Sequence, residues 1–466
     1  MKTGTAARLW RACAMSFAVA SITFGFASWN AASAAQLVTL HDFCSQRACA
    51  EGRNPQGRLL RDSATGDLIG TAANGGTGSG TVYRLHYDPT SGQWRSNKLH
   101  AFCRLDGCSD GAYPVGNLVM DVSGNLYGVT TSGATADLGL AFELVSNGVG
   151  YGFKVLHNFD NNNGDGFSPS AGLTYAGAAS GVLYDGESAL YGTTSQGGAH
   201  SGGRAYELTP NGKKWQETVL YDFCAAEDCT DGQAPGSTLL VDQYGNLFGT
   251  TTSGGNGHGV VFELFPGGGP HRPETPQWTE TVMHTFCSQQ ACADGGYNTG
   301  IVEYSNYSDG LIMDASGSLF GATPGGGAVK AGCCGVLFKI PAEKAPFSNY
   351  TVLYSFCSRN GCKDGANPNG DLLMDASGNL FGTTQSGGGH NIDSDRLGGG
   401  TVFKFSGGAL TTYYTFCSIG TCLDGMYPYA GLATDGKTAL YGTTVNGGPD
   451  AVNENIGDGT VFAIVK

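Results

Sequence analysis

The chain has 466 residues, with 25 Lys and Arg against 39 Asp and Glu, and a formal net charge of -14. This acidic balance argues against nucleic acid and anionic lipid as partners, while cations, neutral glycans and basic proteins remain compatible with it. Glycine is abundant, at 77 residues, yet aromatic residues make up 11% of the chain. The composition is therefore that of a folded protein with many short strands and tight turns.

The first 34 residues are predicted to be a secretory signal peptide. Positive residues at the start precede an apolar run over residues 12–29, and Ala-Ser-Ala at 32–34 fits a cleavage site. A membrane anchor is the alternative, but the run is rich in Ala, Ser and Gly, and no later stretch is apolar enough to span a bilayer. Cleavage lowers the 25 basic side chains to 22 against 39 acidic ones, so the formal charge becomes -17. We expect a mature chain from Ala35, secreted or periplasmic.

A motif of phenylalanine, cysteine, four residues and a second cysteine occurs six times after this segment. The copies begin at Phe43, Phe102, Phe223, Phe286, Phe356 and Phe416. A seventh copy at Phe159 keeps the aromatic residue and the later Asp-Gly but lacks both cysteines. Because the copies are about 60 residues apart, the mature chain is predicted to be one module repeated seven times.

Each module contains four predicted strands. In the copy that starts near Tyr350, strands are expected over residues 350–356, 371–375, 380–384 and 401–405. A cysteine loop follows the first strand, an Ala-Ser-Gly-Asn turn follows the second, and a Gly-rich loop follows the third. Seven four-stranded antiparallel units favour a β-propeller.

The two ends of the mature chain are out of phase with the module. Residues 36–43 match the last strand of a module, and residues 459–466 match the third. A closed ring lets these ends complete one sheet, whereas an open β-solenoid leaves bare edges. Separate small sandwiches are the other alternative, but the linkers are too short and uniform. We therefore predict an all-β domain over residues 35–466, a seven-bladed β-propeller of four-stranded antiparallel blades, closed by the N-terminal strand joining the last blade.

The module resembles the GloVer repeat of the choice-of-anchor tandem-repeat proteins of bacteria. The likeness rests on the cysteine loop, its trailing Asp-Gly and the segment LLMDASGNLFGTT at residues 372–384, in that order, and it covers essentially the whole mature chain. It implies export and a repeat-array fold, but it implies no reaction and no catalytic residues. The chain departs from the family by stopping at Lys466, directly after the last strand, which favours free secretion or periplasmic residence over covalent attachment.

The repeated cysteines are predicted to form disulfides within their own loops, since residues five positions apart in a tight turn meet within bonding distance. The expected pairs are Cys44–Cys49, Cys103–Cys108, Cys224–Cys229, Cys287–Cys292, Cys357–Cys362 and Cys417–Cys422. Zinc is the rival, but its usual ligand spacing and paired sites differ from this pattern. Cys333 and Cys334 are adjacent, so a bond between them would be strained and easily reduced. The pair is either a local staple or a functional element, which would be a rigid ring that presents an apolar surface to a ligand or a redox switch.

The cysteine loops and the Gly-rich loops should lie on one face, because successive loops of an antiparallel blade alternate between faces. We expect ligands to bind there, where such loops ring the channel of a propeller. Three histidines of the Gly-rich loops, His200, His258 and His390, are candidates for metal binding or general-base catalysis. The histidines two residues before the repeated phenylalanine alternate with tyrosine, so we interpret that position as a packing position.

An acidic residue followed by glycine ends each cysteine loop, and we expect its carboxylate to accept nearby backbone N–H groups. Calcium is the alternative ligand, and the cysteine-less loop is its best site, through Asp160, Asn162 and Asp165. No other cofactor is predicted.

The leading functional hypothesis is an exported, non-catalytic binding or scaffolding propeller that recognises a glycan or an extracellular or envelope protein. The rival is a propeller lyase or hydrolase that uses the loop histidines and a divalent metal, and a third reading is a purely structural surface protein. We lean against an enzyme, and we expect a monomer with no nucleic-acid partner and no membrane insertion after signal cleavage.

Overall fold

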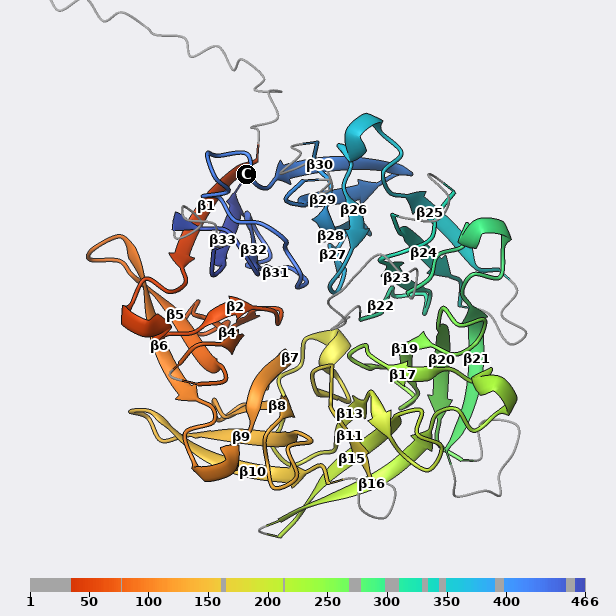
Figure 1. The fold of residues 1–466 in the computed structure, drawn as a ribbon, viewed down its shortest axis with the longest axis horizontal. Helices are drawn as coiled ribbons and strands as arrows, with labels where there is room; N and C mark the ends of the chain where they lie inside the picture. Colours follow the sequence, from red (N-terminus) through yellow and green to blue (C-terminus); the bar gives the residue numbers. More distant parts are fainter. Residues whose placement is uncertain are drawn as a thin grey trace, which may run out of the picture. The chain divides into compact units, whose positions relative to one another are not determined.

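Seven antiparallel sheets follow one another around a ring (Figure 1). The computed structural model describes residues 35–76, 78–160, 165–212, 214–267, 278–297, 310–328, 334–342, 349–389, 398–449 and 457–465. The predicted signal peptide, residues 1–34, is a separate unit outside these residues, so its cleavage stays a prediction. Among the described residues, no helix has the length and apolarity of a membrane span.

Each blade contains four strands, called a to d from the axis outwards (Figure 1). The a strands are β3 (Leu60–Arg61), β7 (Ala112–Met120), β12 (Thr174–Tyr175), β18 (Leu240–Val241), β22 (Ile312–Met313), β27 (Leu373–Met374) and β31 (Ala433–Thr434). The b strands are β4 (Leu68–Asn74), β8 (Leu126–Ser132), β13 (Leu190–Thr194), β19 (Leu247–Ser253), β23 (Leu319–Thr323), β28 (Leu380–Ser386) and β32 (Ala439–Thr444). These two sets give blades 1 to 7 in chain order.

The outer half of each blade is a longer hairpin. The c strands are β5 (Thr81–Asp88), β9 (Leu140–Ser146), β15 (Arg204–Asn211), β20 (Val260–Phe265), β24 (Val336–Ile340), β29 (Thr401–Ser406) and β33 (Thr460–Val465). The d strands are β6 (Gln93–Ala101), β10 (Tyr151–Asn158), β16 (Lys214–Asp222), β21 (Thr279–Thr285), β25 (Thr351–Ser355), β30 (Ala409–Thr415) and, for blade 7, β1 (Gln36–Asp42).

Short elements lie in the connections between blades and, in blade 3, between its strands. Additional strands are β2 (Arg53–Pro55), β17 (Gln233–Pro235) and β26 (Ala366–Pro368), which extend strand b pairing, and the small pair β11 (Gly166–Phe167) and β14 (Gln196–Gly197). The 3-10 turns are η1 (Arg47–Cys49), η2 (Asp106–Cys108), η4 (Ala178–Ser180), η5 (Glu227–Cys229), η6 (Gln290–Cys292) and η7 (Asn360–Cys362).

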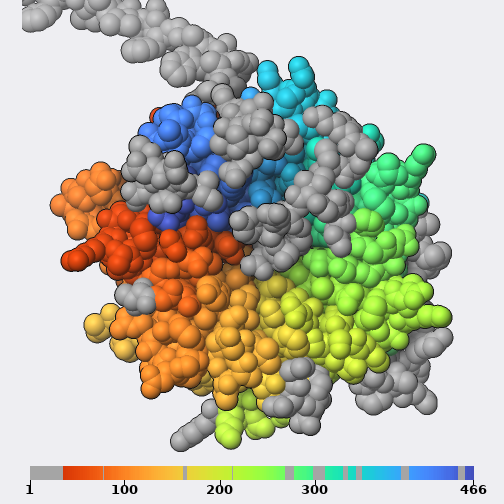
Figure 2. Space-filling model, in the orientation of Figure 1, coloured from red at the N-terminus to blue at the C-terminus, as the bar shows by residue number. Residues whose placement is uncertain are grey.

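The predicted seven-bladed propeller and its closure are confirmed. Strand β1 pairs antiparallel with β33, with Gln36 opposite Val465 and Asp42 opposite Thr460. Blade 7 is therefore completed by the start of the described chain, and neighbouring blades abut around the ring in the space-filling view (Figure 2).

The repeated phenylalanine packs one blade against the next. In all seven copies this residue is at most 2% exposed. Each ring meets an aromatic residue of strand c in the following blade, at centroid distances of 4.8–5.6 Å, as Phe356 meets Phe403. Strand b makes room with a glycine: a Cβ on Gly382 would lie 2.6 Å from Phe403 Cζ. Every c–d pairing contains a β-bulge; in blade 1 the bulged residue is Leu99, which has no partner in the register. The bulge bends the end of strand d towards this aromatic contact.

A backbone hydrogen bond also links each blade to the next. The residue before the last glycine of each Gly-rich loop accepts it, and the distances are 2.7–3.1 Å. The pairs, donor first, are Asn54–Asp458, Tyr113–Ser79, Ser168–Leu138, Ala234–Gly202, Tyr297–His258, Asn367–Cys334 and Tyr427–Gly399. Six of the seven donors, all but Tyr297, are non-glycine residues with φ between 54° and 59°. Such a conformation is costly for most side chains, and the regular bond to the neighbouring blade holds it in place.

Candidate functional site

The loop face is defined here as the face that carries the cysteine loops and the Gly-rich loops. The two sets share a face, as predicted, because a backbone N–H of the Gly-rich loop bonds to the second cysteine of the same blade's loop. Gly388 N–H, for example, donates to Cys362 O at 2.8 Å. The opposite face, called the turn face, carries the a–b turns and the tips of the c–d hairpins.

Six disulfides close the cysteine loops with the predicted pairing. The expectation that these loops ring the channel is wrong in one respect. Their 3-10 turns, from η1 to η7 with η4 excepted, lie at the outer edge of the ring (Figure 1). The reason is topological: each loop leaves the outermost strand of one blade, so its cysteines stay at the rim before the chain returns to the axis.

The acidic residue after each loop holds the loop's backbone, in agreement with the expected turn. Asp364 accepts hydrogen bonds from Ser358 N and Arg359 N at 2.9 and 3.1 Å, and Asp424 accepts the equivalent bonds at 3.0 and 3.2 Å. Burial alone would raise the pKa of Asp294, but hydrogen bonds from His284, Ser288 and Gln289 lower it below its usual range. The role of these carboxylates is therefore structural, since they hold the backbone of the cysteine loops.

The histidine or tyrosine two residues before the repeated phenylalanine does more than pack. Its ring does meet the phenylalanine edge-on, as predicted, with His284 5.3 Å from Phe286. In five copies it also bonds directly to the loop carboxylate at 2.7–3.1 Å, through residues 157, 221, 284, 354 and 414. Sequence reasoning missed this bond. The signal was available, since only His and Tyr occur there and both can donate to the acid that always follows.

His100 gives this position a pH dependence. Burial against Phe102 and Phe153 lowers the pKa of His100, which Asp110, 3.7 Å away, partly raises. Because the pKa of His100 is lowered in the folded state, its contribution to the unfolding free energy is fully present above pH 6.5, the ordinary pKa of histidine. That contribution is lost as the pH falls below this value. We expect His100→Tyr, which copies the residue of three other blades, to reduce the fall in unfolding free energy between pH 7.5 and 5.5, measured by urea titration. Equal pH slopes in both proteins would contradict this.

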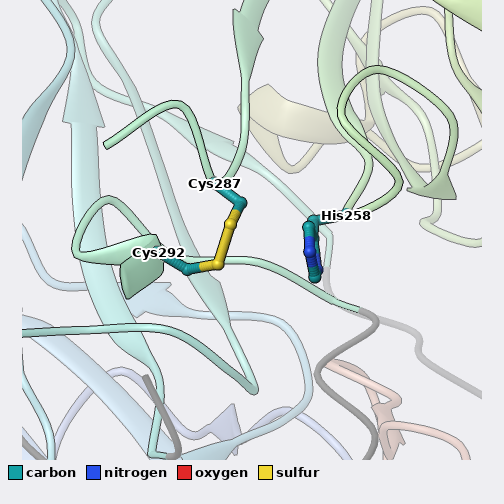
Figure 3. Close-up of side chains that lie close together, drawn as sticks. All are labelled: His258, Cys287 and Cys292. Carbon is teal, nitrogen blue, oxygen red and sulfur yellow. A yellow bond between two sulfur atoms is a disulfide. The ribbon is translucent and has the colours of Figure 1, made fainter. Parts of the chain in front are cut away.

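The three loop histidines do not meet among the described residues. His390 lies outside them, and His200 is exposed after β14 and belongs to no group of potential metal ligands there. The ring of His258 lies beside the Cys287–Cys292 disulfide (Figure 3), with all three ligand atoms within 4.8 Å of one another. Metal ions bind thiolates, and a disulfide offers none, so this donor set does not fit a metal while the bond is intact.

Cys334 occupies the position equivalent to His258 and packs against the Cys357–Cys362 disulfide. It is itself disulfide-bonded and only 1% exposed. Cys333 lies outside the described residues, so a bond between the two stays a prediction.

Only part of the predicted calcium site lies among the described residues. Asn162 is outside the described residues, while Asp165 bonds to His157 at 3.1 Å and faces Arg204 at 3.7 Å, two groups that disfavour a cation.

Polar side chains bridge the axis of the ring, which sequence reasoning did not foresee. Asp371 of blade 6 accepts a hydrogen bond from Asn117 Nδ2 of blade 2 at 2.6 Å and another from Gly310 N at 2.7 Å. Arg58 of blade 1 lies 3.8 Å from the same carboxylate. Arg58, Asn117 and Asp371 are each one residue inserted between a glycine and a leucine that lie close to the axial end of the module, directly before Leu60, Val119 and Leu373. The insertion places a polar side chain at the axis.

The loop face carries a shallow hollow of about 440 Å³ at the rim, between strand d of blade 6 and the cysteine loop that precedes this blade. Two cations and two tyrosines line it, Arg359, Lys363, Tyr413 and Tyr414, together with Thr412, Thr415, Ser418 and Gly388. Arg359 Nη2 donates to Leu410 O at 2.7 Å, which fixes the guanidinium. The two cationic positions hold uncharged residues in the other disulfide loops: Gln46, Leu105, Ala226, Gln289 and Ile419, and Ala50, Ser109, Thr230, Ala293 and Leu423.

Several solved structures align with most of this chain at low sequence identity. They include the Cps50 (Swd1) β-propeller domain of Myceliophteria thermophila, at 9% identity and TM-score 0.47 over 92% of this chain and 99% of that one. A protein of unknown function from Dyadobacter fermentans aligns at 9% identity and TM-score 0.42 over 92% and 98%. A candidate 6-phosphogluconolactonase from Bacteroides uniformis aligns at 12% and 0.44 over 82% and 89%. Such distant likeness concerns the fold alone.

The comparison with curated proteins gives no significant match. The model of the Gloeobacter/Verrucomicrobia repeat, by contrast, matches residues 26–188, 177–362 and 296–466. These segments include all seven modules and the loops that build the loop face. The chain therefore belongs to the Gloeobacter/Verrucomicrobia repeat family.

Proposed function

We propose that the protein is an exported, non-catalytic binding propeller that recognises an acidic group of a glycan or an extracellular protein through its loop face. The observation that carries the proposal is the hollow lined by Arg359, Lys363, Tyr413 and Tyr414. Its volume of about 440 Å³ lies within the range of ligand sites, about 300–1,000 Å³. Arg and Lys side chains form strong charge-assisted bonds with carboxylates.

The rigidity of the loop face supports binding. Disulfides, loop carboxylates and blade-to-blade hydrogen bonds each restrict the loops that surround the hollow. A surface that is ordered before it meets its ligand loses less conformational entropy on binding. The lyase or hydrolase alternative has less support, because among the described residues His258 lies beside an intact disulfide and His200 belongs to no group of potential metal ligands.

Export is part of the proposal and rests on the disulfides. Six bonds within one chain are typical of oxidising compartments and rare in the cytosol. The amino-terminal charge, apolar run and Ala-Ser-Ala pattern support the same route. The resemblance to choice-of-anchor proteins, which concerns attachment after export, is likewise part of this proposal.

A charge-reversal experiment tests the loop-face site. Purified residues 35–466 are screened on a glycan array and in pulldowns from envelope extracts, with and without EDTA. We expect the double variant Arg359→Glu/Lys363→Glu to weaken binding about tenfold or more, since two charge-assisted contacts become repulsive. Binding of the original protein should weaken as salt is raised.

The matched control reverses the same charge on another surface. Arg95 and Lys98 are exposed on β6, outside the loop face, and Arg95→Glu/Lys98→Glu should bind like the original protein. If both double variants lose affinity equally, the attraction comes from overall charge and the loop-face site is refuted. Loss of binding in EDTA would instead support the metal-dependent alternative.

A further inference from the structure

A second hollow, of about 450 Å³, lies on the turn face between blades 2 and 3. Strands β8, β9 and β10 of blade 2 and β13, β15 and β16 of blade 3 are neighbours in the ring (Figure 1). Blade 2 contributes Tyr127, Glu143 and Lys154, and blade 3 contributes Glu187, Pro210 and Trp215, with two glycines. This hollow is on the face opposite the site proposed above, so the inference goes beyond that function.

The wall from blade 2 contains a hydroxyl shared by two buried carboxylates. Tyr127 Oη lies 3.0 Å from Asp121 Oδ2 and 3.3 Å from Glu143 Oε1, and these carboxylates are 3% and 7% exposed in their residues. A phenol has one proton to donate, so it satisfies one acceptor at a time. Asp121 is the nearer and the more fixed, since Ser123 N and Asn125 N also bond to it. Glu143 Oε1 therefore shares the single proton of Tyr127 with Asp121 and can accept a further hydrogen bond.

Lys154 supplies donors beside that acceptor. Its Nζ bonds to Glu143 Oε2 at 2.9 Å, and an ammonium carries three protons, so two remain for other partners. The hollow thus offers an acceptor and a donor side by side, the pattern that a pair of neighbouring hydroxyls matches. A ligand hydroxyl can donate this further hydrogen bond to Glu143 Oε1.

Trp215 supplies an apolar wall opposite these polar groups. It is partly buried, packs on the core cluster of blades 2 and 3, and its ring lies 6.2 Å from that of Tyr127. An indole combines a large rigid apolar face with little conformational entropy to lose. One aromatic wall with adjacent hydrogen-bonding groups suits a ligand that has an apolar face and a polar edge.

The other modules show that this arrangement is specific to blade 2. The Tyr127–Glu143 cross-strand pair corresponds to Ile69–Arg84, Tyr191–Glu207, Phe248–Glu263, Phe320–Lys339, Phe381–Lys404 and Tyr441–Ala463. Lys154 corresponds to Asn97, Thr218, Thr281, Thr351, Thr411 and Val38. Tyrosine, glutamate and lysine coincide in one of the seven copies, so the fold does not require them together.

We infer that this hollow binds one neutral pyranose residue of a glycan. The apolar face of the sugar ring stacks on Trp215, one hydroxyl donates to Glu143 Oε1, and a neighbouring hydroxyl accepts from Lys154 Nζ. The exposed carboxylate of Glu187 at the rim disfavours an acidic sugar here, which separates this site from the cationic hollow on the loop face.

The test uses residues 35–466 and three probes, the methyl glycosides of glucose, galactose and mannose, titrated by saturation-transfer NMR. We expect at least one probe to bind with Kd of about 1–10 mM, a range suited to a single sugar ring. Glu143→Gln, which keeps the shape but loses the charge, should weaken it about tenfold, because a charge-assisted bond is roughly twice as strong as a neutral one. Trp215→Ala should abolish it.

Trp94→Ala is the matched control. Trp94 occupies the same repeat position in blade 1. It lies two residues before the cross-strand partner of Leu85, and Trp215 lies two residues before the cross-strand partner of Leu208. Trp94 packs on the same core cluster as Tyr441, whose cross-strand neighbour is Ala463 and offers no carboxylate. Trp94→Ala should bind the probe like the original protein. Absence of binding to all three probes at about 50 mM, or equal loss in both tryptophan variants, would overturn the inference. Arg359→Glu/Lys363→Glu should leave it intact, so the two proposals fail separately.

Discussion

Removal of residues 35–42 is expected to unfold the propeller, although it deletes only one strand of the seven blades. Strand β1 pairs along its length with β33 and carries Leu37 and Leu40, which pack in the clusters of blades 7 and 1. Its loss leaves the outer edge of β33 without a hydrogen-bonded neighbour. It also removes the strand that holds Phe43 against Tyr83, the contact that joins blade 7 to blade 1. We expect a loss of the same size as the net stability of a domain, about 5–15 kcal/mol.

Thermal unfolding followed by circular dichroism and limited proteolysis measure this effect. The control is a circular permutant that joins the two ends by a short linker and opens the turn after Ser146, between β9 and β10. The ends can be joined because Gln36 lies opposite Val465. The permutant keeps every strand paired and should retain a cooperative transition. A truncated chain as stable as the original would show that the ring does not depend on this closure.

Replacement of Asp371 is expected to have the second-largest effect. The three partners that the described residues give its carboxylate, Asn117 Nδ2, Gly310 N and the Arg58 guanidinium, are all donors. Asp371→Asn keeps the shape but places an amide NH₂ against them, which leaves buried donors unpaired. Because hydrogen bonds to charged groups contribute about 1.5–3 kcal/mol each and Arg58 is partly exposed, we expect a loss of about 2–4 kcal/mol.

Guanidinium chloride denaturation measures that loss as a shift in midpoint at constant slope. Asp106→Asn is the control, since Asp106 is exposed on the loop face and its substitution should change the unfolding free energy by less than about 0.5 kcal/mol. Similar shifts in the two variants would mean that the axial bonds contribute nothing specific.

The repeats made most of the fold predictable. The phase of residues 36–43 and 459–466 specifies ring closure, because a strand missing at one end is supplied at the other. The spacing of each cysteine pair specifies its disulfide, because the contact is local. The rim position of these loops was misjudged, since it depends on strand d being outermost.

The sites were less predictable because they join residues that are distant in sequence. Asn117 and Asp371 meet only because blades 2 and 6 face the same axis. The Glu143 hollow needs Trp215 from the next blade. A comparison of the copies does give a signal in both cases: the inserted polar residue before strand a, and the single coincidence of tyrosine, glutamate and lysine. Neither signal could be interpreted without the positions of the blades.

The pairing of β1 with β33 has a consequence for synthesis. These strands are separated by more than 400 residues, and ribosomes add about 5–20 residues per second. The first strand therefore waits about 20–80 s for its partner, with its backbone groups open to pairing with another nascent chain. Exchange of β1 between two copies is the misassembly that this delay favours. The interval between making the first and last strands thus sets the period of greatest risk for aggregation.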